Sequence, residues 1–328
     1  MIAQYVSSHV KEIVFMSTVI VLLVFTLMSS PSIHVFPKSI ERTSIGRPIN
    51  CQKEIDDFVP LKDFMSHNSS WHEARFQQIM KRESLVPGGR YVPEICGRVS
   101  KFRTLILVPY RDRSSNLIRF LSYMHSFLQR QDIEYQIFII SQAMTPFVPF
   151  NRGALFNIGF QFAMNRTNSS WDCVVYHDVD HLPENEDNIY TCWDVPRHMN
   201  SNDDNNGRLL YSKYFGGVSA MKPAQYIKIN GYSNRFFGWG GEDDDVQKRI
   251  TKIGLEWRHV DLKTGRYFTL GHKKAIPNSR RFDLLRNIEE IMLIDGLNSI
   301  QFTLLSMKKE KLFTNVTVAL AENSSNAK

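Results

Sequence analysis

Apolar residues occur along this chain in short continuous runs that alternate with stretches of helical periodicity. Residues 104–108, 135–140 and 172–176 are mostly apolar runs of strand length, and each predicts a buried β-strand. Residues 116–129 repeat apolar positions at the spacing of one helix face, and 155–164 predicts a second, shorter helix. Strands that alternate with helices indicate an α/β fold with a mostly parallel central sheet wrapped by helices.

The start of the chain follows a different pattern. Residues 13–28 carry no charge and consist mostly of Ile, Val, Leu, Phe and Met. This run is shorter than the roughly 20 residues that span a typical bilayer, although Ser29 and Ser30 extend it enough for a thin membrane. A cleaved signal peptide is the competing interpretation. Lys11, two residues before the run, favours an uncleaved anchor behind a short tail.

Beyond this run, the prolines in 31–60 and the lack of lasting periodicity indicate a stem or linker. Near the other end, 313–320 has the pattern of a strand and is followed by polar residues. The expected organisation is therefore a cytoplasmic tail at 1–12, a transmembrane signal-anchor at 13–30, a stem at 31–60 and one large domain at 61–328.

Composition narrows the class of protein. The chain has 328 residues and 43% hydrophobic content, which is ample for one large core. Its formal charge of +7 would allow nucleic-acid binding. However, the basic residues are scattered, with no long Lys/Arg run and no nucleic-acid motif, so we expect no nucleic-acid partner. The charge instead favours anionic ligands, among them a nucleotide diphosphate.

The cysteines and glycosylation sequons indicate an oxidising compartment. None of Cys51, Cys96, Cys173 and Cys192 lies in a Cys-x-x-Cys pair, which argues against a zinc site. An even number of cysteines after a membrane segment favours disulfides in a lumen. Five Asn-x-Ser/Thr sequons predict N-glycosylation sites, at Asn68, Asn165, Asn168, Asn315 and Asn323.

The strongest chemical signal is the segment 236–245. It places four consecutive acids, 242–245, directly after a loop in which Trp239 stands among glycines. Glycines let a backbone bend and approach a ligand closely, and carboxylates serve as general bases. This combination suits sugar recognition with base catalysis. The acids also suit the positive end of a helix predicted at 246–253, which accounts for one or two of them.

A second acidic centre follows the strand predicted at 172–176. His177, Asp178 and Asp180 lie at its end, where α/β sheets bind ligands. The carboxylates of an Asp-x-Asp motif can share a divalent cation and the diphosphate that it carries, and hard oxygen ligands suit Mg²⁺ or Mn²⁺. A solvated strand end is the alternative. The second acidic cluster some 60 residues later favours the metal site.

The order of these motifs resembles the β-1,4-galactosyltransferase family. Matching blocks cover roughly residues 95–300 in the family's order, at 108–113, 150–159, 178–180, 214–220, 238–245, 281–283 and 295–299. The resemblance implies a nucleotide-sugar glycosyltransferase type A fold and a single-pass type II protein of the Golgi membrane, whose luminal catalytic domain is 61–328. It also implies the disulfides Cys51–Cys96 and Cys173–Cys192.

The resemblance also implies where the nucleotide and the metal bind. The expected nucleotide contacts are Pro109, Tyr110, Arg111, Arg113, Phe150, Arg152, Asp178 and Val179. Arginine suits a diphosphate because its guanidinium can bind two oxygens at once. For Arg111 and Arg113, the alternative is an ordinary surface loop. For residues 150–152, it is simple helix capping by Asn151.

The metal ligands implied by the resemblance are Asp180 and His272, with Mn²⁺ as the expected ion. The family usually has a methionine three residues before this histidine, whereas this chain has Thr269. A hydroxyl is a harder and weaker neutral donor than a thioether. Thr269 is therefore a doubtful third ligand, and its alternative role is that of a β-branched strand residue facing the core.

Sugar binding and catalysis are assigned by the same resemblance. The donor sugar is expected at Tyr214, Gly217 and Trp239, and a tyrosine at the first position goes with galactose donors. The acceptor is expected at Glu242, Asp243, Asp244, Arg281, Phe282 and Leu285, with Asp243 as general base and with Glu242 and Trp239 beside it in the catalytic group. The alternative for Tyr214 is that of an aromatic residue in a strand. The alternative for 281–285 is one face of an amphipathic helix.

The function that follows is metal-dependent, inverting transfer of galactose from UDP-galactose to the 4-hydroxyl of a terminal N-acetylglucosamine on glycoproteins or glycolipids. Transfer of N-acetylgalactosamine, or transfer of galactose to xylose in proteoglycan linkers, is the enzymatic alternative. A membrane-anchored sugar-binding protein without activity is the alternative from another class, and the loss of the methionine is its only support. The sequence leaves the oligomeric state open.

Overall fold

The computed structural model describes residues 57–93, 100, 102–144, 148–166, 170–203, 209–273 and 275–320. The expected tail, the anchor and most of the stem lie outside these residues, as do Cys51, Cys96, Asn168 and Asn323. The described part of the chain falls within one unit, Cys51–Lys328. None of the helices described in it is long and apolar enough to cross a membrane.

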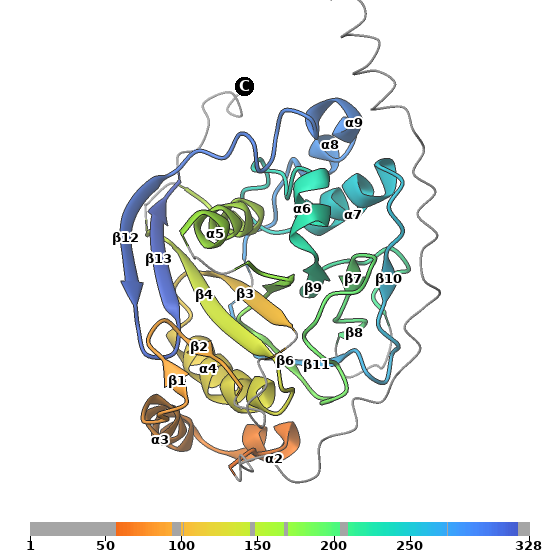
Figure 1. The fold of residues 1–328 in the computed structure, drawn as a ribbon. Helices are drawn as coiled ribbons and strands as arrows, with labels where there is room; N and C mark the ends of the chain where they lie inside the picture. The colour runs from red at the N-terminus through yellow and green to blue at the C-terminus, as the bar shows by residue number, and fades with distance from the viewer. Residues whose placement is uncertain are drawn as a thin grey trace, which may run out of the picture. The chain divides into compact units, whose positions relative to one another are not determined.

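The main sheet is formed by β1 Leu85–Val86, β2 Arg90–Tyr91, β3 Arg103–Tyr110, β4 Glu134–Gln142, β5 Cys173–His177, β7 Arg197–His198, β9 Val218–Met221, β10 Arg258–His259, β12 Thr303–Lys309 and β13 Thr314–Ala319. Its order is β1-β2-β4-β3-β5-β9-β7-β10, and β13 and β12 continue it from β4 (Figure 1). The centre is parallel, because β3 runs parallel to both β4 and β5, whereas β9 is antiparallel to β5.

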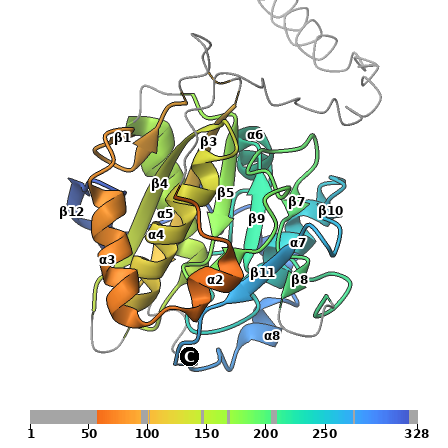
Figure 2. The same ribbon diagram turned by 90° about the horizontal axis from the view of Figure 1, so that it is seen from below.

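The helices are α2 Leu61–Ser66, α3 Ser69–Met80, α4 Ser114–Gln129, α5 Arg152–Arg166, α6 Pro223–Lys228, α7 Glu242–Lys252, α8 Arg281–Leu284 and α9 Ile288–Ile291. Figures 1 and 2 show α4 on one face of the sheet, together with α3, and α5 on the opposite face. A small second sheet of β6 His181–Pro183, β8 Asn202–Asp203 and β11 Arg266–Thr269 has the order β6-β11-β8.

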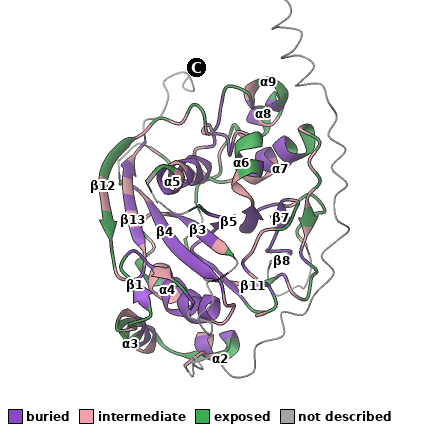
Figure 3. Ribbon diagram, viewed as in Figure 1, coloured by how far each residue is buried: buried purple, intermediate pink, exposed green. Residues whose placement is uncertain are grey.

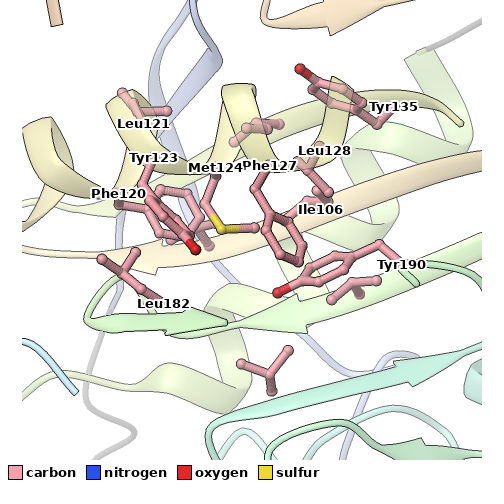
Figure 4. Packing of buried hydrophobic residues seen from close by; sticks show 14 of the residues in the cluster. Ile106, Phe120, Leu121, Tyr123, Met124, Phe127, Leu128, Tyr135, Leu182 and Tyr190 are labelled. Carbon is pink, nitrogen blue, oxygen red and sulfur yellow. The ribbon is translucent and has the colours of Figure 1, made fainter. Parts of the chain in front are cut away.

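Alternation along β3 divides the core into two layers. Successive strand residues point to opposite faces of a sheet. Ile106 and Val108 accordingly join the core cluster that contains α4, whereas Leu105 and Leu107 join the cluster that contains α5. Figure 4 shows side chains of α4 packed over Ile106 of β3 and towards Leu182 of β6 and Tyr190. The central strands are buried along nearly their whole length (Figure 3), which explains their continuous apolar sequences.

The strands expected at 104–108, 135–140, 172–176 and 313–320 are confirmed as β3, β4, β5 and β13, and the helix expected at 116–129 is confirmed as α4. The helix expected at 155–164 is α5, which begins earlier, at Arg152. Asn151 caps it, because the backbone N–H of Ala154 donates to its side-chain oxygen at 2.9 Å. The predicted capping role of Asn151 is therefore confirmed.

The start predicted for the helix at 246–253 was wrong. We expected it at residue 246, but α7 begins at Glu242, so all four acids lie in its first turn. Gly241 has a φ of 98°, a left-handed conformation that glycine adopts without strain. The chain therefore turns directly into the helix, and the acids lie at its positive end.

The predicted disulfide between Cys173 and Cys192 is confirmed. It joins the start of β5 to the loop after β6, with 5.1 Å between the two Cα atoms. The partner pairing, Cys51–Cys96, lies outside the described residues. The confirmed bond closes a loop that contains the Asp-x-Asp motif, and it therefore limits the movement of that motif relative to the sheet.

Candidate active site

The two predicted phosphate and metal segments meet at one edge of the sheet. Arg113 follows β3, and Asp178 and Asp180 follow β5. Because β3 and β5 are parallel neighbours, the ends of both strands bring their loops to the same edge. The Nη1 atom of Arg113 lies 2.7 Å from Oδ2 of Asp180. The structure thus joins the two segments by a direct ion pair.

Asp180 is buried, with 3% of its surface exposed, and it has three cationic or imidazole partners. Besides Arg113, Nε2 of His272 lies 3.0 Å from Oδ2 and Nδ1 of His181 lies 2.8 Å from Oδ1. Burial by itself raises the pKa of Asp180, but the hydrogen bonds from His181 and His272 and the charge of Arg113 outweigh it. The pKa of Asp180 is therefore held well below its ordinary value.

This cluster fits a divalent cation. Ligand atoms of Asp178, Asp180 and His181 lie within 4.8 Å of one another, and His272 contacts Asp180 directly. Ionised carboxylates and imidazole nitrogens together suit Mn²⁺. The contact between His272 and Asp180, which lie in separate segments, supports the predicted ligand pair. Sequence analysis did not select His181, although it follows the Asp-x-Asp motif directly.

Arg152, at the start of α5, links the two acidic centres. Its Nε lies 2.5 Å from Oδ1 of Asp178, and its Nη1 lies 2.5 Å from Oδ1 of Asp243 and 3.7 Å from Glu242. It also donates to the backbone carbonyl of Gly217. Burial lowers the pKa of Arg152, but the charges of Asp178 and Asp243 outweigh this, and the pKa is raised well above its ordinary value. Arg152 thus stays charged between these carboxylates.

The four acids of the first turn of α7 have different partners. Asp245 is buried and pairs with Arg249 one turn later, with 2.6 Å between Oδ2 and Nε. Asp244 accepts a hydrogen bond from the hydroxyl of Tyr211 at 2.8 Å. Only Glu242 and Asp243 contact Arg152. The structural role expected for one or two of the acids therefore belongs to Asp245, and Glu242 and Asp243 contribute to the site.

Glu242 is buried, and Asp243, beside it in the first turn of α7, is half-buried. Burial, and then the charge of Asp243, raise the pKa of Glu242 to about 8. Burial also raises the pKa of Asp243, against the opposing effect of Arg152. A carboxylate with a raised pKa is a stronger proton acceptor when ionised. Asp243 therefore has the raised basicity that a general base needs.

The raised pKa of Glu242 predicts a pH-dependent stability. Below its ordinary pKa of 4.5, the Glu242 carboxyl is neutral in both the folded and the unfolded protein, so folding buries no charge. As the pH rises towards about 8, the unfolded protein loses this proton more readily than the folded one, and the free energy of unfolding falls. Glutamine imitates the neutral acid at every pH. The melting temperature of Glu242→Gln should therefore exceed that of the wild type by several degrees at about pH 8, with a difference that shrinks towards about pH 5. Circular-dichroism melts measure this, and parallel pH profiles would contradict it.

Tyr214 and Asp243 approach each other across Gly216. A Cβ atom at residue 216 would lie 2.6 Å from Oδ2 of Asp243 and equally close to the Tyr214 hydroxyl. Only glycine fits at this position. Tyr214 lies in the loop before β9 and not in a strand, so the strand alternative is wrong. The structure thus places the predicted donor-sugar residue beside the predicted base.

Trp239 and the acceptor segment form a second, exposed group. Trp239 is 59% exposed and Phe282 is 63% exposed. The backbone of Trp239 pairs with Ile276 and Asn278 through hydrogen bonds of 2.9 Å each. The Arg281 guanidinium lies 4.6 Å from the ring centre of Phe282 and 5.8 Å from that of Trp239. The loop with Trp239 and the segment of the predicted acceptor residues are therefore held together.

The remaining predicted residues occupy the edges of these groups. Arg111 lies over the ring of Phe150, 5.3 Å from its centre. Pro109 and Tyr110 end β3, whereas the side chain of Val179 is buried in the core, so only its backbone can contact a ligand. Leu285 follows α8 and is half-buried; that helix has only four residues, and the buried side chain in it is Leu284.

Thr269 ends β11 opposite His181 in the antiparallel pair with β6. Its side chain is exposed, so the alternative that it faces the core is wrong. Leu270, next in the chain, donates its backbone N–H to the carbonyl of Asp180 at 2.7 Å. Thr269 therefore lies on the segment that borders the metal cluster.

Comparison with known proteins gives clear family matches. A family model described as the N-terminal region of glycosyl transferase group 7 matches residues 59–193, and one described as the N-terminal domain of galactosyltransferase matches residues 197–273. The chain is 40% identical to β-1,4-galactosyltransferase 4 of Cricetulus griseus over 246 residues, which are 74% of this chain and 70% of the relative. It is also 40% identical to β-1,4-galactosyltransferase 1 of Homo sapiens, over 72% of this chain and 59% of the relative.

Solved structures show the same fold. The catalytic domain of Drosophila β-1,4-galactosyltransferase 7 in complex with xylobiose superposes with a TM-score of 0.60 at 26% identity, over 69% of this chain and 97% of that one. A mutant of the same Drosophila protein, in complex with manganese, UDP-Gal and xylobiose, gives a TM-score of 0.60 at 25% identity, with the same coverage. The expected nucleotide-sugar glycosyltransferase type A fold is therefore confirmed.

Proposed function

Because this chain belongs to the β-1,4-galactosyltransferase family, we propose that it transfers galactose from UDP-galactose to the 4-hydroxyl of a terminal N-acetylglucosamine. The reaction inverts the anomeric carbon, because the hydroxyl attacks it from the side opposite to UDP. Arg152 carries this proposal, since it joins Asp178 of the Asp-x-Asp motif to Asp243 through ion pairs of 2.5 Å. The diphosphate segment and the proposed base thereby form one site.

Each residue has a role that follows from its contacts. Asp243 accepts the proton of the attacking hydroxyl, and its raised pKa suits this step. Tyr214, beside Asp243 across Gly216, contacts the donor sugar. Arg111 and Arg113 bind the diphosphate. Trp239 and the 281–285 segment bind the acceptor from the exposed side and exclude water, because hydrolysis of UDP-galactose competes with transfer.

The metal site of this proposal uses Asp180 and His272, with His181 and Asp178 within reach. When bound there, Mn²⁺ supplies positive charge to the departing diphosphate. The Drosophila relative in complex with manganese and UDP-Gal supports this assignment. Arg113 pairs with Asp180 in this structure. With the donor bound, its guanidinium would supply a second positive charge to the departing diphosphate.

A donor and acceptor panel tests the proposal. The full chain is incubated with tritiated UDP-galactose or UDP-N-acetylgalactosamine, each with free N-acetylglucosamine or a xyloside, and with Mn²⁺. We expect transfer of galactose to N-acetylglucosamine to dominate. Dominant transfer to xylose would show that xylose, and not N-acetylglucosamine, is the acceptor. The xyloside is included because the Drosophila relative is in complex with xylobiose. Absence of transfer from either donor would favour a non-catalytic sugar-binding protein.

The proposed cellular setting is the Golgi membrane, with a type II orientation, an anchor at 13–30 and a luminal catalytic domain. The Cys173–Cys192 bond supports an oxidising lumen. Asn68 and Asn165 are exposed and accessible to glycosylation, whereas Asn315 lies in β13 and accepts a hydrogen bond from Ser141. Within the described residues, Asn68 and Asn165 are therefore the better candidates.

Replacing Tyr214 with leucine should change the choice of donor. The tyrosine ring and hydroxyl fill the space beside Gly216 that the N-acetyl group of a larger donor would need. We expect Tyr214→Leu to raise the ratio of N-acetylgalactosamine to galactose transfer by about tenfold, as expected for a change of one contact in a binding pocket. A competition assay with both donors measures the ratio, and an unchanged ratio would move donor choice to other residues.

Replacing Thr269 with methionine should change the metal response. Loss of a soft thioether weakens Mn²⁺ binding, so a restored sulfur should lower the Mn²⁺ concentration for half-maximal activity by several-fold. Thr269 is exposed beside the metal cluster, so the substitution should change the free energy of unfolding by no more than about 0.5 kcal/mol. An unchanged Mn²⁺ titration would show that residue 269 lies outside the coordination shell.

A further inference from the structure

Two histidines on neighbouring strands hold both ends of the loop that carries Tyr214. His198, on β7, and His259, on β10, face each other with 2.9 Å between their Nδ1 atoms. The Nε2 atom of His198 lies 2.8 Å from the carbonyl of Gly216, and Nε2 of His259 lies 3.0 Å from the carbonyl of Ser212. Residues 212–217 are named the donor loop below.

The geometry requires more protons than two neutral histidines carry. A carbonyl oxygen can only accept, so each Nε2 must carry a hydrogen to bond its carbonyl. A neutral imidazole carries one N–H, so both Nδ1 atoms would then face each other with lone pairs at 2.9 Å. One further proton between the two Nδ1 atoms turns this repulsion into a hydrogen bond. The complete chain from Gly216 to Ser212 therefore carries three protons and a net charge of +1.

The pair acts on the active site through the donor loop. The carbonyl of Gly216, bound by His198, belongs to the residue whose Cα faces both Asp243 and the hydroxyl of Tyr214. The rings of His198 and Tyr214 also meet edge to face, with 5.1 Å between their centres. A second ring contact joins His198 to Phe215, with 5.7 Å between the ring centres. A change at the histidine pair is thus transmitted to the loop through two backbone carbonyls and two ring contacts.

Arg197 on β7 and Arg258 on β10 are the charged residues next to the two histidines along the chain. Each charged group has a partner outside the pair. Arg197 donates to the backbone carbonyls of Ile189 and Thr191, Arg258 lies near Glu256 at the surface, and Asp243 pairs with Arg152.

We propose that His198 and His259, joined by one shared extra proton, are positioning residues that fix the donor loop and thereby set the affinity for the donor sugar. This rests on the proposed contact between Tyr214 and the sugar of UDP-galactose. The two carbonyl contacts hold the donor loop at both ends. Loss of either contact frees one end of the loop, and the affinity for the donor falls.

Hydrogen–deuterium exchange tests the clamp without any assay of activity. The full chain in detergent micelles is compared with His259→Gln and His259→Arg at each pH, so that the intrinsic exchange rate cancels. Glutamine cannot bridge both partners, whereas arginine has several donors and stays charged. At about pH 6, we expect exchange of the donor-loop peptide to be about tenfold faster in His259→Gln than in the wild type, and unchanged in His259→Arg. Equal exchange in all three proteins would overturn the clamp.

Steady-state kinetics then test its consequence for the donor. His259→Gln should raise the KM for UDP-galactose about tenfold with little change in kcat, because it loses the contact with the Ser212 carbonyl. His259→Arg should match the wild type. The dissociation constant of UDP alone should stay constant, because the loop contacts the sugar. His67→Gln, an exposed histidine beside Trp71, is the matched control.

The outcomes separate this proposal from the proposed function. If the exchange result holds but the wild type does not use UDP-galactose, the clamp stands and the assignment of the donor fails. If the wild type uses UDP-galactose and the KM of His259→Gln stays equal to that of the wild type at each pH, the positioning role is refuted. An equal loss for UDP and UDP-galactose would also refute it, since that pattern indicates a general structural defect.

Discussion

Asp243→Asn is expected to lower kcat for galactose transfer by about 10²–10⁴-fold, the usual contribution of a positioned general base. An amide does not accept the proton of the acceptor hydroxyl at neutral pH. Its oxygen can still accept the hydrogen bond from Nη1 of Arg152, which now lies 2.5 Å from Oδ1 of Asp243. The fold and the affinity for UDP-galactose should therefore remain, so the loss should appear in kcat.

The measurement combines single-turnover transfer with calorimetric binding of UDP-galactose. Asp172→Asn is the matched control, because Asp172 is partly exposed and pairs with Arg103 outside the site. It should transfer galactose like the wild type. Wild-type turnover in Asp243→Asn would refute the assignment of the base, and loss of donor binding together with kcat would assign Asp243 to the donor site.

Arg152→Lys is expected to have the second-largest effect, a loss of about 10²-fold in kcat/KM. The guanidinium reaches Asp178 through Nε and Asp243 through Nη1 at the same time. The single ammonium of lysine keeps the charge but cannot bridge both carboxylates in that geometry. Whichever carboxylate loses its partner then remains half-buried and uncompensated, which destabilises the site.

This variant is tested by kinetics and by thermal unfolding together. Arg103→Lys is its matched control, since Arg103 pairs with Asp172 at the partly exposed end of β3 and surface pairs contribute about 0–1 kcal/mol. A lower melting temperature with a shifted pH profile of kcat is the expected pattern for Arg152→Lys. A purely thermal effect, with normal kinetics in the folded fraction, would reduce Arg152 to a structural ion pair.

The sequence predicts the parts of this site that depend on local pattern. Apolar runs identify β3, β4 and β5, because strands buried on both faces carry continuous apolar residues. The Asp-x-Asp motif and the acids after Trp239 are visible as clusters. Asp245 could also have been assigned from sequence, since Arg249 stands four residues later on the same helix face.

Contacts between distant segments were not predictable in the same way. Arg152 stood out in the sequence only as a nucleotide contact, whereas its place between Asp178 and Asp243 depends on how three loops meet at the sheet edge. His198 and His259 gave no sequence signal, because they are 61 residues apart and become neighbours through β7 and β10. Pairings of this kind are set by sheet order, which periodicity does not encode.

The position of β13 has a consequence for how this protein is made. β3 covers one edge of β4, and the other edge is shared by β2, from early in the domain, and β13, from late in it. Until residues 314–318 have left the ribosome, half of that edge has no partner. An unpaired edge of a buried apolar strand invites pairing with another chain. During synthesis of the domain, this part of the β4 edge therefore stays exposed until β13 pairs with it. A chaperone is needed most during this interval.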